Sequence, residues 1–257
     1  MALHPQTTNM TFRVTLFGRP RIRCGDVALE LALSNRDLLT LVALLLPQDG
    51  ACSREEIAFS LWPDLTEAEA RAALRRSLYR LQRVLPPSNG PWIHCKGRSI
   101  TWAARETTWV DVNEFERLSR EADGIDEALG LYRADFLEHV DHEWVNAHRE
   151  RLRQRACKLL SIAATSRGED EHRRLSHLER LLTFDPWRED IVREMLHVRC
   201  SLGDRAGALA SYLGFKQRLA EEIGIEPMPE TVHCYRSIME GRVLDDLAQR
   251  RQEKAFA

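Results

Sequence analysis

The stretch TEAEARAALRRSLYRLQRVL, residues 66–85, decides how the surrounding chain folds. Thr66 and Glu69 form a capping box, in which each side chain binds the backbone amide of the other residue, so a helix begins here. Pro86 and Pro87 end this helix, because proline lacks the amide hydrogen that a helix interior needs. Leucines recur along one face at three- and four-residue spacing, at Leu74, Leu78, Leu81 and Leu85, and we predict that this face packs on a core.

The segments on either side of this helix have their own start and stop signals. Ser53 and Glu56 form a second capping box, which opens a helix that Trp62-Pro63 stops. The full set of predicted elements is strands at 12–17, 21–23 and 27–31, helices at 36–46, 53–62 and 66–85, and a closing hairpin of 92–95 and 99–102. Strands, three helices and a hairpin, in that order, are typical of a winged helix-turn-helix. We therefore predict a winged-helix DNA-binding domain over residues 1–105.

Residues 106–257 have an almost wholly helical pattern. Asp111 is predicted to cap the first helix, and a long helix starts near Trp144. Gly168 and Gly203 are 35 residues apart, close to the period of about 34 residues in tetratricopeptide helix pairs. Gly203-Asp204 ends one helix and caps the next. The predicted fold is mainly α with a small β component: a winged helix-turn-helix over residues 1–105, followed over residues 106–257 by an all-α, tetratricopeptide-like helical domain with a polar tail after about residue 241.

Composition and charge limit the possible cellular locations and binding partners of the protein. The net charge of −2 divides unevenly, as +5 over residues 1–105 and −7 over residues 106–257, so only the first part suits a polyanion. No apolar run approaches the roughly 20 residues of a membrane helix, and Met1–Met10 lacks the pattern of a secretory signal. The six cysteines show no C-x-x-C spacing. These features predict a cytoplasmic protein with no membrane partner.

The arginines of residues 66–85 form the main candidate site. Arg76, Arg80 and Arg83 lie opposite the leucines, and no acidic residue occurs between Arg71 and Leu85. A solvated basic face is the commoner explanation of such a helix. Its place as the second helix of a helix-turn-helix, ahead of a basic Lys96-Gly97-Arg98 hairpin tip, favours DNA contact instead. The predicted DNA-binding residues are Arg71, Arg75, Arg76, Tyr79, Arg80, Arg83, Lys96 and Arg98.

Two other kinds of site are not supported by the sequence. His139, His142, Glu143 and His148 lack the H-E-x-x-H spacing that places two histidines on one helical face, so we predict surface histidines and no metal. No nucleophile elbow, G-x-G-x-x-G or P-loop is present. We therefore expect no catalytic residues, no cofactor and no enzyme activity.

Motifs spread over residues 12–239 resemble one family. They are Leu16-Phe17-Gly18; Leu38–Leu46; Ser53-Arg54-Glu55 with Leu61-Trp62-Pro63-Asp64; Ala70-Arg71 with Leu74, Leu78, Arg80-Leu81 and Val84-Leu85; Val110-Asp111-Val112 with Phe115-Glu116 and Leu118; Glu143-Trp144; Gly203-Asp204-Arg205 with Ala208-Leu209 and Tyr212; and Leu219 to Pro227 with Pro229-Glu230-Thr231. Together they resemble the SARP-type transcriptional activators, which join an OmpR-type winged helix to a bacterial transcriptional activator domain. The run Leu219–Thr231 is the most specific of them.

The resemblance implies binding to double-stranded DNA through residues 66–85, with the hairpin contacting the adjacent groove. It also implies recruitment of RNA polymerase or its sigma factor by the C-terminal domain, and a homodimer on tandem direct repeats. Neither an ATPase nor a phosphopeptide-binding extension is expected after this chain, nor a receiver domain before it. The family often has Asn near Ala73 and Gly-Gly-Tyr where this chain has Gly97-Arg98-Ser99, so base specificity does not carry over.

Two function classes follow from the residues. One is a DNA-binding transcription activator, and the other is a protein-interaction module in which the winged helix and the helical repeats dock on protein partners. A protein-docking helix usually mixes apolar residues into its exposed side, and residues 66–85 offer only Tyr79 and alanines there. This difference favours the DNA-binding activator.

Overall fold

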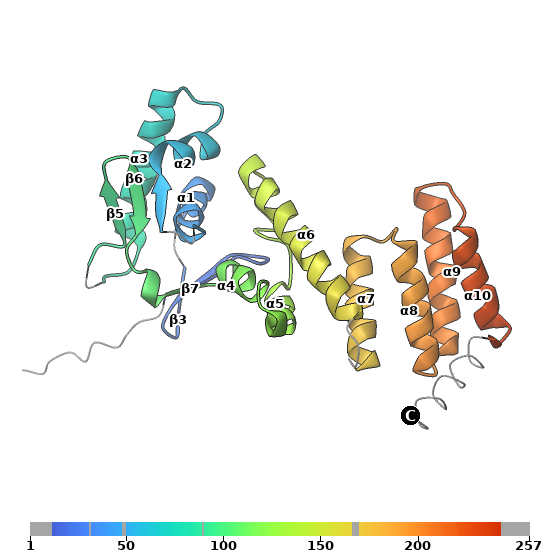
Figure 1. The fold of residues 1–257 in the computed structure, drawn as a ribbon. Coiled ribbons are helices and arrows are strands. Elements are labelled where there is room, and N and C mark those ends of the chain that lie inside the picture. Colours follow the sequence, from blue (N-terminus) through green and yellow to red (C-terminus); the bar gives the residue numbers. More distant parts are fainter. Residues whose placement is uncertain (1–11, 31, 48–49, 89, 166–169, 243–257) are drawn as a thin grey trace, which may run out of the picture. The chain divides into compact units, whose positions relative to one another are not determined.

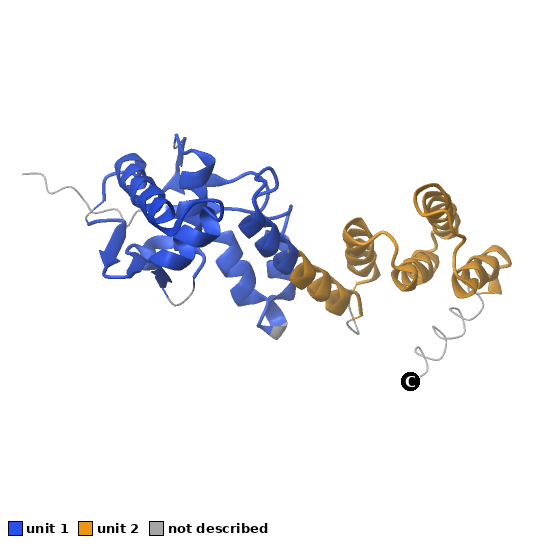
Figure 2. Cartoon of the chain, turned by 90° about the horizontal axis from the view of Figure 1, so that it is seen from above, with its two compact units in different colours: residues 1–152 blue, residues 153–257 orange. Residues whose placement is uncertain are grey.

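A computed structural model describes residues 12–30, 32–47, 50–88, 90–165 and 170–242 (Figure 1). The chain divides into two compact units, residues 1–152 and 153–257 (Figure 2), and the division falls within a helix, α6 (Glu143–Thr165). Within the described residues, none of the helices is both long and apolar enough to cross a membrane.

A four-stranded sheet opens the first unit. Its strands are β1 (Phe12–Thr15), β2 (Arg21–Cys24), β3 (Val27–Leu29) and β7 (Thr108–Val110), in the order β3-β2-β1-β7. The first three pair antiparallel as the sequence predicts, whereas β1 and β7 pair in parallel, with Val14 opposite Val110. The sequence analysis missed β7, because a three-residue strand is too short to show an alternating pattern.

The winged helix follows the first three strands in the predicted order. Its elements are α1 (Asn35–Leu45), β4 (Ala51–Ser53), α2 (Arg54–Leu61), α3 (Glu67–Val84), β5 (Ile93–Lys96) and β6 (Ser99–Trp102). Helix α3 packs against α1 and α2, and the predicted leucine stripe is buried in that contact. Strand β4 is a further addition to the prediction, and it extends the hairpin to a sheet of order β4-β6-β5. The predicted fold class is confirmed.

The first unit continues through a short helical segment. The 3-10 helix η1 (Arg105–Thr107) precedes β7, and α4 (Asp111–Leu118), the 3-10 helix η2 (Ala122–Gly124), α5 (Ile125–Leu131) and α6 follow it. Asp111 is the first residue of α4 rather than its cap. Its carboxylate accepts hydrogen bonds from the amides of Leu16 and Phe17, 94 to 95 residues earlier in the chain, at 2.8–3.0 Å. The role predicted for Asp111 is therefore wrong, because its carboxylate bonds to the end of β1 and to the adjacent Val112 amide instead of capping the first turn.

The second unit contains antiparallel helices α7 (Glu171–Phe184), α8 (Glu189–Ser201), α9 (Arg205–Glu222) and α10 (Pro229–Met239). Helix α8 packs on α7, α9 and α10. As predicted, Gly203 ends α8 with a positive φ of 84°, and the Asp204 carboxylate accepts a hydrogen bond from the Gly207 amide at 2.8 Å. Ala208 and Tyr212 are buried in the helix contact. Gly168 and the polar tail beyond residue 242 lie outside the described residues.

The division at residue 152 differs from the boundary placed at residue 105 in the sequence analysis. A break at residue 105 separates β1 from its partner β7 and from the Asp111 carboxylate. Phe17 also packs its ring against Phe115 and Tyr132, at centroid distances of 5.4 and 4.8 Å. The first unit therefore includes residues on both sides of that boundary.

Candidate nucleic-acid interface

Helix α3 is held by a complete capping box at its first turn. The Glu69 carboxylate accepts hydrogen bonds from the Thr66 amide at 3.0 Å and from the Thr66 hydroxyl at 2.6 Å, and these bonds lower the pKa of Glu69. The Thr66 oxygen in turn accepts from the Glu69 amide. The predicted start of the helix is thus confirmed.

A polar network on the buried side ties α3 to α1. Asp37 of α1 is 3% exposed, and its carboxylate accepts from the Ser77 hydroxyl at 2.6 Å and from the Arg80 guanidinium at 2.7 and 2.9 Å. Burial disfavours the charged carboxylate, but the hydrogen bonds from Arg80, Ser77 and Ser34 outweigh burial and lower the pKa of Asp37 to about 2. The network fixes the rotation of α3 about its own axis.

Two of the predicted arginines have acidic partners, contrary to the expectation of an unneutralised face. Arg80 binds Asp37, as described above. Arg71 pairs with Glu67 at 2.9 Å, one turn earlier, and with Glu55 of α2 at 3.3 Å. Their acidic partners lie outside the segment between Arg71 and Leu85, either earlier in the same helix or on other helices, so the pattern within that segment does not reveal them.

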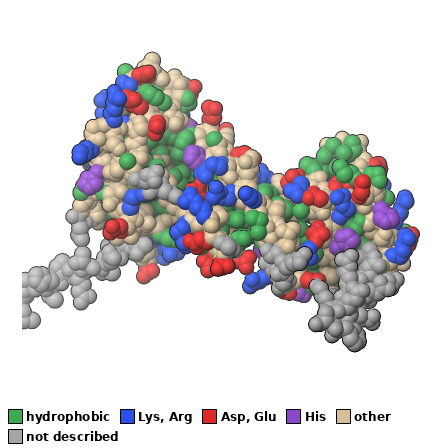
Figure 3. Space-filling view, viewed as in Figure 1, with side chains coloured by type: hydrophobic (Ala, Val, Ile, Leu, Met, Phe, Trp, Pro, Cys, Tyr) green, Lys and Arg blue, Asp and Glu red, His purple; other side chains and the backbone are tan. Residues whose placement is uncertain are grey.

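The remaining outer face of α3 is exposed and basic. Arg75, Arg76 and Arg83 are exposed, and no described carboxylate forms an ion pair with any of them. Tyr79 lies among them with 60% of its surface exposed, and its hydroxyl accepts a hydrogen bond from the Arg83 guanidinium at 3.3 Å. In Figure 3, Lys and Arg side chains gather at the upper left, where Figure 1 shows α3 and the hairpin.

The hairpin tip lies beside this face. Gly97 has a positive φ of 58°, which glycine adopts without strain, and the flanking Lys96 and Arg98 are exposed. A groove of about 250 Å³ runs between α3 and the tip. Its lining consists of Arg54, Glu55, Arg71, Leu74, Arg75, Leu78, Gly97 and Arg98. The structure thus brings two predicted DNA-binding residues of the helix, Arg71 and Arg75, together with one predicted residue of the tip, Arg98.

Arg54 is a member of this groove that the sequence analysis did not identify. Its amide donates to the Arg98 carbonyl at 2.9 Å, and its buried Nε has no hydrogen-bond partner among the described residues. Arg54 is also the first residue of α2, where the helix dipole favours an anion. Only the pairing of β4 with β6 places Arg54 beside the tip, and the sequence offers no signal for that pairing.

The three histidines do not form a metal site. His139 is exposed, but His142 lies against the Arg36 side chain and 3.3 Å from the Leu61 carbonyl. The His148 Nδ1 donates to the Trp144 carbonyl at 2.9 Å, and burial lowers the pKa of His148. His142 and His148 are thus partly buried, whereas His139 has the predicted surface position. In the described part of the chain, no three His, Cys, Asp or Glu side chains are placed to hold a metal ion.

Known proteins that are similar to this chain indicate its family. A model of the bacterial transcriptional activator domain matches residues 110–239. The regulatory protein AfsR of Streptomyces griseus is 26% identical over 264 aligned residues, which cover 95% of this chain and 26% of AfsR. The transcriptional regulatory protein MoaR1 of Mycobacterium tuberculosis is 33% identical over 73 residues, or 28% of this chain and 24% of MoaR1. The chain thus spans about a quarter of the length of AfsR.

A solved structure supports the fold. Mycobacterium tuberculosis EmbR, in complex with a low-affinity phosphopeptide, superposes with a TM-score of 0.62 at 15% identity, and the match covers 96% of this chain and 71% of EmbR. The match extends over nearly the whole of this chain, whereas the family model begins at β7. Given the matched domain and these relatives, the chain belongs to the SARP-type transcriptional activators, the family that carries the bacterial transcriptional activator domain.

Proposed function

We propose that this protein is a sequence-specific DNA-binding transcription activator that reads the major groove with the outer face of α3. The observation that carries the proposal is the exposed set Arg75, Arg76, Tyr79 and Arg83. Arginine can bind the edge of guanine through two hydrogen bonds, and it can also bind phosphate. Such an array on the second helix of a helix-turn-helix suits DNA better than it suits an apolar protein surface.

The groove beside the hairpin tip suits the DNA backbone. Arg54 and Arg98 converge there with Arg75, and the first turn of α2 adds the positive end of its helix dipole. Phosphate contacts of this kind set the position and register of a protein on the duplex but do not read its sequence. In this proposal, α3 supplies specificity, and the groove and Lys96 supply affinity. Arg71, paired with Glu55 and Glu67, contributes less than its predicted share.

The activator domain supplies the second half of the proposed function. It is expected to contact RNA polymerase or its sigma factor while two protomers occupy tandem direct repeats near a promoter. The relatives are regulatory proteins by name, which supports a role in transcription. Several arginines of the second unit are bound to its own acidic side chains, so its surface suits a protein partner better than a polyanion.

The test is a binding titration with matched variants. A duplex is first selected from random sequences by the wild-type protein, and its affinity for the variant Arg75→Ala/Arg76→Ala/Arg83→Ala is then measured by fluorescence anisotropy. We expect a loss of at least about a hundredfold, because each base-contacting arginine is worth about 1–3 kcal/mol. The control, Arg174→Ala/Arg188→Ala/Arg199→Ala, removes the same charge from the second unit and should bind within about threefold of wild type.

Two results would count against the proposal. If the α3 variant binds as tightly as wild type while its melting temperature is unchanged, α3 is not the reading helix. If selection enriches no sequence at all and the protein instead retains a protein partner through α3, the interaction-module alternative replaces it. Activation is checked separately by transcription in vitro on a promoter that carries two copies of the selected site.

A further inference from the structure

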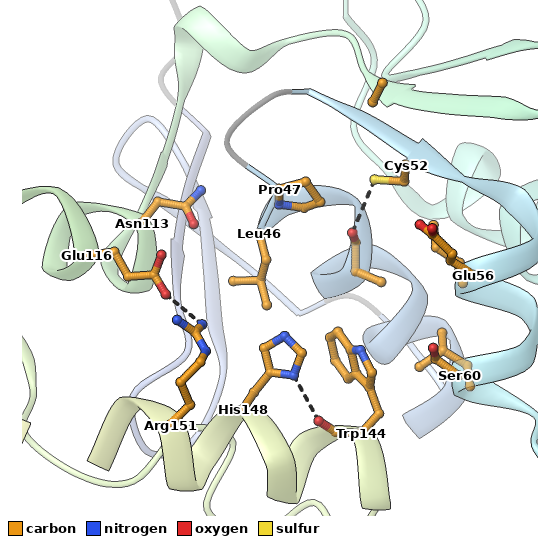
Figure 4. Close-up of a pocket in the computed structure, with 14 residues that line it drawn as sticks. Leu46, Pro47, Cys52, Glu56, Ser60, Asn113, Glu116, Trp144, His148 and Arg151 are labelled. Carbon is orange, nitrogen blue, oxygen red and sulfur yellow. Dashed lines mark hydrogen bonds and ion pairs between the residues drawn. The ribbon is translucent and has the colours of Figure 1, made fainter. Parts of the chain in front are cut away.

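A second cavity, of about 330 Å³, lies inside the first unit and away from the DNA-facing groove (Figure 4). The end of α1, the strand β4 and the helix α2 form one side, and α4 and α6 form the other. Its volume is at the lower end of the range of about 300–1,000 Å³ that small-molecule sites have in proteins. An occupant of this cavity would contact both the winged helix and the start of the activator domain.

One wall of the cavity is aromatic. The rings of Trp144 and His148 lie 4.4 Å apart, centroid to centroid, at an angle of 45°. Both side chains project from α6 into the space below Leu46 in Figure 4. Burial lowers the pKa of His148 against the opposing effect of the hydrogen bond from its Nδ1 to the Trp144 carbonyl, so the neutral imidazole is favoured at pH 7. A flat ring can pack on such a wall without meeting a positive charge.

The charged residues around the cavity favour one sign of ligand. Arg151 pairs with Glu116 at 2.6 Å, so these two charges offset each other. Glu56 of α2 lies on the opposite side in Figure 4, next to Ser60. With His148 neutral, Glu56 is the charged side chain of the lining that has no ion pair among the described residues, and Arg105, whose charge acts on Cys52, lies outside the lining. An anion would be repelled, whereas a cation gains a favourable interaction.

We propose that this cavity binds a planar aromatic small molecule that is neutral or positively charged, with its ring against Trp144 and its donors toward Glu56. The site is separate from the groove beside the hairpin tip, since the two share no lining residue. It joins elements of the winged helix to helices of the activator domain, so the ligand would be an effector that bridges them.

The test uses three probes of similar shape and different charge: benzamidine, benzamide and benzoate. Binding to the full chain is followed by the nuclear magnetic resonance shift of the Trp144 indole proton at millimolar probe concentration. We expect benzamidine to bind at least about fivefold more tightly than benzoate, with benzamide between them. Equal affinity for the cation and the anion would overturn the proposal, as would the absence of any shift with all three probes.

Substitutions inside and outside the cavity test where the probe binds. Ser60→Trp fills the cavity from its rim and should abolish the shift, while Ser88→Trp, at an exposed loop position outside the cavity, should leave it intact. Glu56→Gln should remove the preference of the site for benzamidine over benzamide. Glu55→Gln is the matched control, because Glu55 is the next residue along the chain but lines the groove beside the hairpin tip instead of this cavity. Retained binding in Ser60→Trp, or an equal effect of the two glutamine variants, would contradict the assignment.

Discussion

Arginines have opposite environments in two regions of this molecule. On the outer face of α3, Arg75, Arg76 and Arg83 are exposed without an acidic partner among the described residues. In the second unit, Arg199 pairs with Glu179 at 2.5 Å and with Asp204 at 2.7 Å, and Arg188 pairs with Asp190 at 2.5 Å. The comparison teaches that the number of arginines says little about function. What distinguishes the two regions is whether the fold already supplies the countercharge.

The largest effect is expected when the two regions are separated as fragments and each is tested for DNA binding. A fragment of residues 1–152 keeps β7 and Asp111, and we expect it to fold and to bind the selected duplex. A fragment of residues 153–257 should bind no DNA at the same concentrations, because several of its arginines pair with its own acidic side chains. Electrophoretic mobility shift and circular dichroism measure binding and folding together.

The position of the cut matters as much as the separation. A fragment of residues 1–105 lacks the parallel partner of β1 and leaves the amides of Leu16 and Phe17 without their acceptor. We expect this shorter fragment to be largely unfolded or strongly destabilised, since buried amides without partners cost about 1–3 kcal/mol each. A shorter fragment as stable as the longer one would show that β7 contributes nothing to the winged helix.

The same comparison can be made within α3, because Arg80 has an acidic partner, as Arg188 and Arg199 of the second unit do. Arg80→Ala leaves the buried Asp37 carboxylate without its cation, and we expect a loss of about 2–3 kcal/mol in the free energy of unfolding. This is below the range for a fully buried pair, because the Arg80 side chain is 49% exposed. Urea denaturation measures it. Adding Asp37→Asn should recover part of the loss, and Arg76→Ala should change stability by less than about 0.5 kcal/mol.

The sequence predicts the helix that carries Arg76 and Arg80 but does not distinguish the environments of these two arginines. Helix period and capping residues predicted α3, its leucine face and the hairpin, because those signals are local. Arg76 and Arg80 look equivalent on that basis. Only the packing of α1 on α3 reveals that Asp37 lies beside Arg80 and not beside Arg76. Arg54 was missed for the same reason, since its neighbours belong to a sheet that forms between distant segments.

The pKa of Asp111 tests the hydrogen-bonded contact between the end of β1 and the start of α4. Burial raises the pKa of Asp111 to about 6, against an opposing effect of its backbone hydrogen bonds. Because the folded protein holds this proton more tightly than the unfolded chain does, the stabilisation is present below about pH 4 and is lost as the pH rises to about 6. We expect the difference in unfolding free energy between wild type and Asp111→Asn to fall by about 2–3 kcal/mol over that interval.

Chemical denaturation of both proteins at a series of pH values measures this difference, in which other titrating groups cancel. A difference that stays constant between pH 4 and 6 would show that folding leaves the pKa of Asp111 unchanged. A difference that grows with pH would mean that the amides of Leu16, Phe17 and Val112 outweigh burial and lower the pKa.

The smallest expected effect concerns the hairpin tip. With about six phosphate contacts per protomer, the logarithm of the binding constant should fall with the logarithm of salt concentration at a slope of roughly −5. Lys96→Ala/Arg98→Ala should reduce this steepness by up to about two units. Titrations between low and physiological salt measure the slope, and Arg188→Ala in the second unit serves as the control. An unchanged slope would remove the tip from the interface.

The parallel pairing of β1 with β7 has a consequence for how the chain reaches its native state. Phe12 lies opposite Thr108, so the first strand acquires its last neighbour only after nearly a hundred further residues have been synthesised. Long-range contacts of this kind slow folding, because the intervening chain loses entropy when the loop closes. On the ribosome, the amino-terminal hairpin must therefore wait, with one strand edge unprotected, until the first segment of the activator domain emerges and completes the sheet.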